Sequence, residues 1–128
     1  MKKIVISIET TEKNQIIDIT ELISDLVKDL DDQIILVSIP YTTAGITVNE
    51  NYDPAVKSDL IFSFNIISPN YKEFRHEEGN SDAHVKRSLV SRSEQFVVLD
   101  KKLDLGKWEG IYFCEFHGPR HREIWIYV

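Results

Sequence analysis

The sequence is poor in cysteine and has no long apolar run. Cys114 is the one cysteine among 128 residues, so no internal disulfide is possible, which is typical of a reducing cytoplasm. It lies in an alternating apolar segment, where we expect an inert buried thiol rather than a nucleophile. No apolar stretch reaches the roughly 18 to 20 residues of a membrane-spanning helix. We therefore expect a cytoplasmic protein that does not enter a membrane.

The N-terminus has only part of a signal-peptide pattern. Its basic start is followed by Ile4–Ile6, but polar Ser7 and Glu9 interrupt the apolar segment and no cleavage site follows. The alternation of isoleucines with smaller or polar residues predicts a first β-strand instead.

Arginine and histidine are absent from the first 74 residues, although the net charge is −6 overall. Residues 1–69 have five lysines and 11 acidic residues, whereas residues 70–128 have ten basic and ten acidic residues. The acidic total argues against nucleic-acid binding. Arginine matches the geometry of phosphate and histidine exchanges protons near neutral pH, so the second half is where we expect chemistry. Arginines on a solvated surface are the alternative interpretation.

The hydrophobic and charged fractions, 42% and 28%, are ordinary for a globular chain, and no repeat or linker divides it. We expect one domain, residues 1–128. Periodicity and turn residues predict strands near 4–9, 16–19, 34–39, 96–99, 108–116 and 123–128, two main helices near 20–30 and 54–67, and a short helix at 83–90. This order predicts an α+β fold with largely antiparallel or mixed sheets packed against helices.

Several local details of this fold are predicted too. Thr20 is typical of a helix N-cap, and Asp53-Pro54 of a helix opening. Residues 34–39 are almost all apolar, which favours a strand covered on both faces. A buried stripe on the second helix is expected from the spacing of Val56, Leu60, Phe64 and Ile67.

The last two predicted strands are rich in large apolar residues on both faces. A small domain cannot easily bury both faces of such a terminal hairpin alone. We therefore predict a homo-oligomer in which sheets from different subunits pack together.

Residues 41–50 read Y-T-T-A-G-I-T-V-N-E, with two adjacent hydroxyls, a small residue and a glycine. Pro40 and Gly45 interrupt the strand pattern, so a bulge or turn is expected near Thr42–Gly45. A backbone of this kind allows a ligand to approach closely, but threonine is also a good strand former. Asn49 and Glu50 supply side-chain oxygens with no strong structural explanation.

The segment Arg75–Lys86 has the densest mixture of polar groups in the chain. Two histidines, three acids, an asparagine, a serine and two cations surround one glycine just before a predicted helix. Such a mixture is poor core material and favours a cavity or ligand. The N–H groups at the helix start favour an anion beside Asn80 and Ser81, and His84 lies one turn inside.

Two chemical interpretations of these residues remain open. One is metal binding by His76 and His84, with His117 or His121 as a further imidazole and Asp82 or Glu115 as a carboxylate, although no pair has a tight metal-site spacing. The other is acid–base catalysis by His84 near a phosphate, assisted by Arg120. No serine lies in a recognisable nucleophile elbow.

Three segments together resemble the signatures of the YjbQ family, also called secondary thiamine-phosphate synthase. They are T-T-A-G-I-T-V-N-E at 42–50 followed by Asp53-Pro54, H-x-E-G-N-S-D-A-H-x-K at 76–86, and L-G-x-W-x-G-I at 105–111 with E-F-x-G-P-R-x-R at 115–122. Their order matches along the chain from about Ile34 to the end. The N-terminal third agrees only in outline.

The resemblance implies a YjbQ-like α+β fold, a homotrimer with clefts near subunit boundaries, and a weak transferase activity that couples a pyrimidine diphosphate to a thiazole phosphate. It implies catalytic roles for His84, His76, Glu50 and Asp82. It implies ligand or phosphate binding by Thr42, Thr43, Asn49, Asn80, Ser81, Glu115 and Arg120. Whether a divalent metal ion takes part is left open, with His76 and His84 as candidate ligands.

The sequence departs from the family pattern at Tyr41, where a histidine is usual. Tyrosine titrates near pH 10, so Tyr41 cannot act as a base at neutral pH. We therefore weigh three hypotheses: a transferase of the thiamine-phosphate synthase type, a non-catalytic binder of a phosphorylated small molecule, and a metal-dependent hydrolase.

Overall fold

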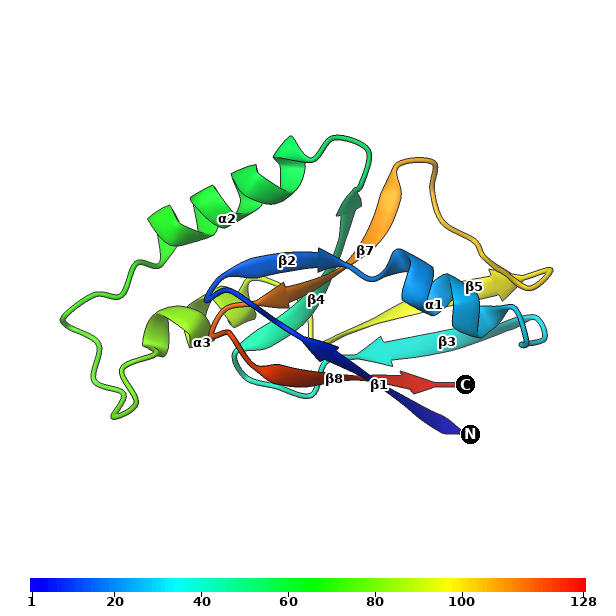
Figure 1. The fold of residues 1–128 in the computed structure, drawn as a ribbon, viewed down its shortest axis with the longest axis horizontal. Helices are drawn as coiled ribbons and strands as arrows, with labels where there is room; N and C mark the ends of the chain where they lie inside the picture. Colours follow the sequence, from blue (N-terminus) through cyan, green and yellow to red (C-terminus); the bar gives the residue numbers. More distant parts are fainter.

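A computed structural model describes all 128 residues as eight strands and three helices (Figure 1). The elements in chain order are β1 (Lys3–Glu9), β2 (Gln15–Asp18), α1 (Thr20–Val27), β3 (Gln33–Ser38), β4 (Ala44–Glu50), α2 (Ala55–Ile67), α3 (Ser81–Ser88), β5 (Ser93–Leu99), β6 (Lys102–Leu103), β7 (Glu109–Glu115) and β8 (His121–Tyr127). None of the helices combines the length and apolar character that a bilayer crossing requires.

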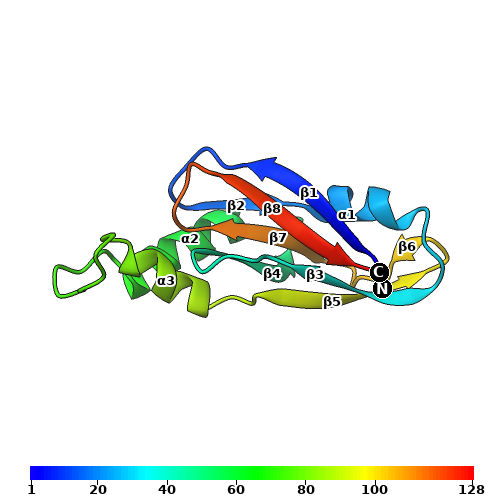
Figure 2. The same cartoon turned by 90° about the horizontal axis from the view of Figure 1, so that it is seen from below.

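The strands form two antiparallel sheets. One has five strands in the order β1-β8-β3-β5-β6, and the other has three in the order β2-β7-β4. β1 and β8 run side by side, and the two termini meet where Lys2 and Val128 exchange backbone hydrogen bonds (Figures 1 and 2). The predicted α+β class and antiparallel arrangement are confirmed.

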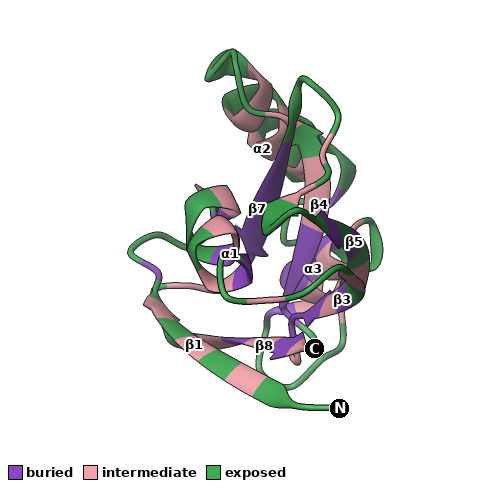
Figure 3. Ribbon diagram, turned by 90° about the vertical axis from the view of Figure 1, so that its right-hand side faces the viewer, coloured by how far each residue is buried: buried purple, intermediate pink, exposed green.

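The main core lies between the two sheets and helix α1. Isoleucine, valine and phenylalanine side chains dominate this cluster of 14 buried residues, with Ile35 and Ile126 from the larger sheet and Ile111 and Phe113 from β7. A second cluster of five buried residues, including Tyr112 and Cys114, covers the other side of β7 toward α2 and α3. β7 is therefore buried on both faces, which Figure 3 shows as a nearly continuous buried ribbon.

The predicted terminal hairpin is wrong. β7 belongs to the three-stranded sheet and β8 to the five-stranded sheet, so the loop after Glu115 crosses between the sheets. Both faces of β7 are covered by the chain itself, and the uncovered hairpin faces from which an oligomer was predicted do not exist. Cys114 is fully buried in this strand, and burial raises the pKa of its thiol to about 12. It is the inert thiol that the sequence indicates.

Two helix starts differ in detail from the prediction. Thr20 is the first residue of α1 rather than its cap, because Asp18 Oδ1 accepts hydrogen bonds from the Thr20 N–H (2.9 Å) and hydroxyl (2.5 Å). At α2, Pro54 holds the cap position that was predicted for Asp53, and Asp53 Oδ1 accepts from the Ala55 N–H at 2.9 Å.

Two apolar surfaces predicted to be covered are covered only in part. On α2, Leu60 and Phe64 of the predicted stripe pack against the second cluster, but Ile67 is 55% exposed, because the helix lies at the margin of the fold (Figure 1). In β3, Ile34 is 64% exposed on the outer face of the five-stranded sheet, which no element of the chain covers.

Smaller shifts affect the second half of the chain. α3 begins at Ser81 rather than Ala83, and β8 begins at His121 rather than Glu123. Asp100 and Lys101 have φ of 51° and 63°, which suits the two-residue hairpin loop between β5 and β6.

Candidate functional site

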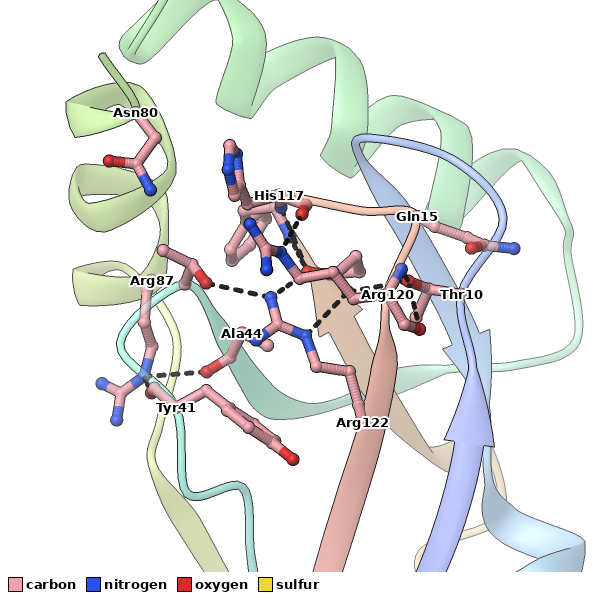
Figure 4. Close-up of polar contacts among 12 residues, drawn as sticks. Thr10, Gln15, Tyr41, Ala44, Asn80, Arg87, His117, Arg120 and Arg122 are labelled. Carbon is pink, nitrogen blue, oxygen red and sulfur yellow. Dashed lines mark hydrogen bonds and ion pairs between the residues drawn. The ribbon is translucent and has the colours of Figure 1, made fainter. Parts of the chain in front are cut away.

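A cavity of about 310 Å³ opens where β4 begins, β7 ends and α3 begins. None of its nine lining side chains is hydrophobic: they are Thr42, Thr43, His76, Glu78, Asn80, His84, His117, Arg120 and Arg122. They come from three segments far apart in the sequence. Figure 4 shows Asn80 just before α3, His117 and Arg120 on the loop after β7, and Arg122 at the start of β8.

Two glycines allow these segments to approach one another. A Cβ on Gly118 would lie 2.1 Å from the Glu12 carbonyl oxygen, so only glycine fits where this loop crosses the β1–β2 connection. A Cβ on Gly45 would lie 2.6 Å from Val90 and 2.7 Å from the Ser91 carbonyl oxygen, so glycine lets β4 pack against the end of α3. The backbone thus brings the Thr42–Thr43 bend, α3 and the His117–Arg122 segment together.

A buried ion pair between Arg122 and Glu115 supports the floor of the cavity. Arg122 donates from Nε to Glu115 Oε1 (2.9 Å) and from Nη2 to Oε2 (2.6 Å), and Nη2 also donates to Thr43 Oγ1 (2.9 Å). The Thr10 hydroxyl donates to Glu115 Oε1 at 2.8 Å. Burial acts to raise the pKa of Glu115, but the bonds from Arg122, the His117 N–H and Thr10 outweigh it and lower the pKa. Glu115 is therefore ionised and fully engaged.

Arg120 differs from Arg122 although only one residue separates them. It is exposed, and its guanidinium makes one hydrogen bond within the chain, from Nε to the His117 carbonyl oxygen at 2.8 Å. The Arg120 N–H donates to Thr10 Oγ1 at 2.8 Å, which fixes its backbone to the buried network. The remaining guanidinium donors are available for an anion in the cavity.

The start of α3 combines buried polar groups with unused acceptors. Asn80 is 3% exposed and its Oδ1 has no hydrogen-bond partner. Asp82 is 1% exposed and bonds Lys13 through Oδ2 at 2.7 Å, with Lys86 Nζ at 4.0 Å, but its Oδ1 has no partner. Burial acts to raise the pKa of Asp82, and Lys13 outweighs it, so that the pKa is lowered.

Lys86 is a buried cation next to this carboxylate. Its side chain is 2% exposed, and Nζ donates to Asn65 Oδ1 (2.7 Å) and Asn14 Oδ1 (3.2 Å). Burial lowers the pKa of Lys86, Asp82 opposes the shift, and Lys13 adds to it. Lys86 ties α3 to α2 and the β1–β2 connection, and so holds the helix start against the cavity.

Three histidines line the cavity. The rings of His76 and His84 pack edge to face with centroids 5.0 Å apart. His117 Nδ1 is buried without a hydrogen-bond partner. Burial, and then Arg120 and Lys13, lower the pKa of His117 below its ordinary value. The fourth, His121, lies on the outer surface and pairs with Glu9, which raises its pKa.

The structure brings together six of the residues chosen from the sequence: Thr42, Thr43, His76, Asn80, His84 and Arg120. Three others, Ser81, Asp82 and Glu115, adjoin the cavity without lining it. Of these, Glu115 forms an ion pair with Arg122, and Asp82 forms an ion pair with Lys13. Their place in the structure is that of supports for the lining residues.

Asn49 and Glu50 lie at the far end of β4 from Thr43. A strand of this length spans about 20 Å, so they do not share the cavity within one chain. There Glu50 Oε2 accepts from the Asp53 N–H at 3.3 Å, and the Glu50 carbonyl oxygen accepts from the Tyr112 hydroxyl at 2.9 Å.

Three lining residues were not among the predicted set: Glu78, His117 and Arg122. All three lie inside the segments that the sequence singles out, so the neighbourhood was indicated but the individual side chains were not. His117 was considered only as a further imidazole for a metal. What identifies it is its position at the end of β7, which sequence spacing does not reveal.

The donor set does not fit a metal centre. No group of three or more histidine, cysteine, aspartate or glutamate side chains is placed to hold one ion. His76 and His84 are adjacent, but the carboxylates proposed beside them, Asp82 and Glu115, are turned to lysine and arginine. The cavity is lined instead by two arginines and three histidines.

A larger hollow of about 560 Å³ lies between α1 and the β5–β6 turn. Its lining includes Lys28, Lys101 and Lys102 over apolar Leu103 and Leu105. It contains no histidine and none of the buried unpartnered polar atoms. We therefore assign the candidate site to the smaller polar cavity.

Comparisons with known proteins agree with this architecture. Residues 4–128 match the family model described as UPF0047 protein YjbQ-like. The chain is 44% identical over 123 residues to UPF0047 protein MJ1081 of Methanocaldococcus jannaschii (94% of this chain, 89% of that protein). It is 44% identical over 124 residues to UPF0047 protein YugU of Bacillus subtilis (94% of each). A crystal structure of a family protein from Clostridium acetobutylicum superposes with a TM-score of 0.92 at 43% identity, covering 97% of this chain and 98% of that one. The chain belongs to the YjbQ-like UPF0047 family.

Proposed function

We propose that the polar cavity binds a phosphorylated small molecule. The observation that supports this most strongly is the lining itself: two arginines, three histidines, two threonines and an asparagine around about 310 Å³, with no hydrophobic side chain. Arginine forks and the N–H groups at the start of an eight-residue helix are the donors that phosphate oxygens prefer. Glu78 is the one carboxylate among the lining residues, and its Oε2 accepts from Asn80 Nδ2 at 3.4 Å.

Each wall has a distinct role in this proposal. Arg120 and the α3 N–H groups hold the phosphate, and the Thr42 and Thr43 hydroxyls complete its coordination. His84, on α3, and His76, whose ring packs against it, exchange protons with the reacting groups. Glu115 does not touch the ligand and holds Arg122 in place instead.

The reaction we propose is a weak transfer of the thiamine-phosphate synthase type. A nitrogen of the thiazole phosphate attacks the methylene carbon of the pyrimidine diphosphate, the carbon–oxygen bond breaks, and pyrophosphate leaves with the bonding electrons. Arginine and helix N–H groups stabilise the negative charge on the leaving group. The polar lining suits the phosphate portions of both substrates.

The test is calorimetric titration of the protein with inorganic pyrophosphate, alongside an assay of product formation. Arg120→Ala is expected to weaken pyrophosphate binding about tenfold to a hundredfold, because a charge-assisted bond contributes about 1.5–3 kcal/mol. Arg92→Ala, an exposed arginine outside the cavity, is the matched control and is expected to bind as wild type does. Equal affinity in wild type and Arg120→Ala would contradict the proposal.

A second candidate is a binder of phosphorylated molecules without turnover. Tyr41 favours it, because its ring packs on the Arg122 guanidinium (4.6 Å) and its hydroxyl accepts from the Glu123 N–H (2.8 Å). Tyr41 therefore belongs to the support of the cavity and supplies no proton to a ligand. Pyrophosphate binding without any product from the two substrates would establish this candidate over the transferase.

We also propose that the protein is a homotrimer in the cytoplasm. Val97 and Ile34, paired in register on the outer face of the five-stranded sheet, are 39% and 64% exposed, and Leu99 is 45% exposed. On α2, Phe62 and Ile66 are 67% and 62% exposed. Exposed apolar side chains that lie next to one another, as Ile34 and Val97 do, are typical of subunit contacts.

Sedimentation equilibrium tests the assembly. We expect a mass of three chains, and we expect Ile34→Lys to shift the distribution toward single chains because a charge would enter the contact. Lys2→Glu, at the exposed N-terminus, is the control for a change of surface charge. A wild-type mass equal to one chain would contradict the trimer.

A further inference from the structure

The ring of His117 stands in the cavity with an unused nitrogen. Its Nδ1 is buried and has no hydrogen-bond partner within the chain. The backbone of the same residue is fixed on both sides, because its N–H donates to Glu115 Oε2 at 3.1 Å and its carbonyl oxygen accepts from Arg120 Nε at 2.8 Å. The imidazole is thus held beside the arginine to which we assign the phosphate (Figure 4).

Three other acid–base groups near the cavity already have charged partners within the chain. Glu115 bonds Arg122 and Thr10, and Asp82 bonds Lys13 and lies behind the cavity wall. His121 pairs with Glu9 on the outer surface. His117, in contrast, lines the cavity and has a ring nitrogen without a hydrogen-bond partner.

Charged groups surround His117 from four elements. Arg120 lies on its own loop, Lys13 on the β1–β2 connection, Asp82 on α3 and Glu115 on β7. Burial is the largest influence and lowers the pKa of the imidazole, the two cations lower it further, and the two carboxylates oppose them. The ring is neutral at pH 7, and its lone pair can accept a proton. A dianion bound to Arg120 would offset the cation and favour the protonated ring.

We infer that the His117 imidazole takes up a proton when a phosphorylated molecule binds, and then donates a charge-assisted hydrogen bond to it. This inference rests on the proposed phosphate site. The proton comes from solvent, and no bond to phosphorus is made or broken. Binding at this site therefore consumes a proton, and the ligand is a dianion at its phosphate end.

Sulfate is the probe, because it has the shape and charge of a phosphate dianion and does not itself titrate between pH 5 and 8. The NMR signals of the four histidine rings, assigned with single His→Asn variants, are followed against pH without and with saturating sulfate. We expect His117 to titrate below 6.5 without sulfate and about one pH unit higher with it. The signal of His121, outside the cavity, should not depend on sulfate.

Affinity gives an independent measurement. A shift of about one unit means that sulfate binds the protonated ring about tenfold more tightly. Wild-type affinity should therefore rise by about that factor as the pH falls from 8 to 5.5, and His117→Asn should reduce the rise to less than threefold. His121→Asn is the matched control and should retain the wild-type pH dependence.

The outcomes separate the inference from the function on which it rests. If sulfate binds and shifts His76 or His84 while the pKa of His117 stays unchanged, the inference is wrong and the phosphate site stands. If sulfate binds but shifts none of the cavity histidines, the inference is wrong; if sulfate does not bind, the phosphate site and the inference are both wrong. The wild-type titration decides between these cases without relying on a variant that folds.

Discussion

The walls of the cavity and the layer beneath it each contain an arginine and a glutamate, which are exposed on the walls and buried in the layer beneath. In the layer beneath, Arg122 and Glu115 are 5% and 0% exposed, and both oxygens of the carboxylate are bonded to the guanidinium. On the wall, Arg120 and Glu78 are exposed, and Arg120 makes a single guanidinium bond within the chain. The buried pair fixes the geometry of the cavity floor. The exposed Arg120 keeps guanidinium donors available for a ligand.

The comparison teaches that residue type alone does not assign a role in this site. An arginine that bonds a buried carboxylate twice has few donors left for a ligand, and an exposed arginine contributes little to stability. The lower layer should therefore affect folding strongly, and the walls should affect binding without affecting folding.

The largest expected effect is on the buried pair. Glu115→Gln leaves the Arg122 guanidinium buried without a counter-charge, so we expect the free energy of unfolding to fall by about 3–5 kcal/mol. Chemical denaturation measures the change. Glu78→Gln, the matched substitution on the wall, should change the free energy by less than about 0.5 kcal/mol. Similar losses in the two variants would remove the distinction between the layers.

The same pair should determine how the protein responds to acid. The pKa of Glu115 is lower in the folded protein than in the unfolded chain, so its contribution to stability is present above its ordinary pKa of 4.5 and is lost as the pH falls through the folded pKa. Between pH 5 and pH 3, wild type should therefore lose more stability than Glu115→Gln. Parallel curves for the two proteins would contradict this assignment.

The start of α3 should show an intermediate effect. Asp82→Asn removes the charge that Lys13 bonds at 2.7 Å and that lies 4.0 Å from buried Lys86. We expect a loss of about 1–3 kcal/mol in the free energy of unfolding, less than for Glu115→Gln because Lys13 is half exposed and Lys86 keeps its two asparagines. Asp59→Asn, on the exposed face of α2, is the control. A loss below that of the control would mean that Asp82 does not hold the helix start.

Most of the fold could be predicted because its elements have clear local patterns. Alternating isoleucines give β1, and Asp100-Lys101 gives the β5–β6 turn. The failure at β7 and β8 has a physical reason: alternation says which residues face inward but not which strand is the neighbour. The short loop after Glu115 has the length of a hairpin turn, but it crosses between the sheets.

The site could be predicted as a neighbourhood but not residue by residue. Thr43 and Glu50 lie in one motif, yet the strand between them places them at opposite ends, which only the extended conformation reveals. His117 and His121 lie in one turn, but the register of β8 against β1 directs His121 to Glu9 on the outside. Such differences depend on which distant strands pair, and the spacing of residues along the chain does not reveal that pairing.

Tyr41 provides the smallest expected effect. Tyr41→Phe removes the hydroxyl that accepts from the Glu123 N–H and keeps the ring on Arg122, so we expect a loss of about 1 kcal/mol in the free energy of unfolding and unchanged pyrophosphate binding. Tyr41→His introduces an imidazole at this position. Because Tyr41 does not line the cavity, we expect turnover of the two thiamine precursors to change less than about threefold.

The two substitutions at Tyr41 together distinguish support from catalysis. If Tyr41 belongs to the supporting layer, both variants should lose stability while binding pyrophosphate as wild type does. A gain in turnover of tenfold or more in Tyr41→His alone would instead place this position among the reacting groups, since Tyr41→Phe changes the same packing without adding a proton acceptor. Such a gain would also show that the layer beneath the cavity takes part in the reaction, and would end the distinction between the two layers at this residue.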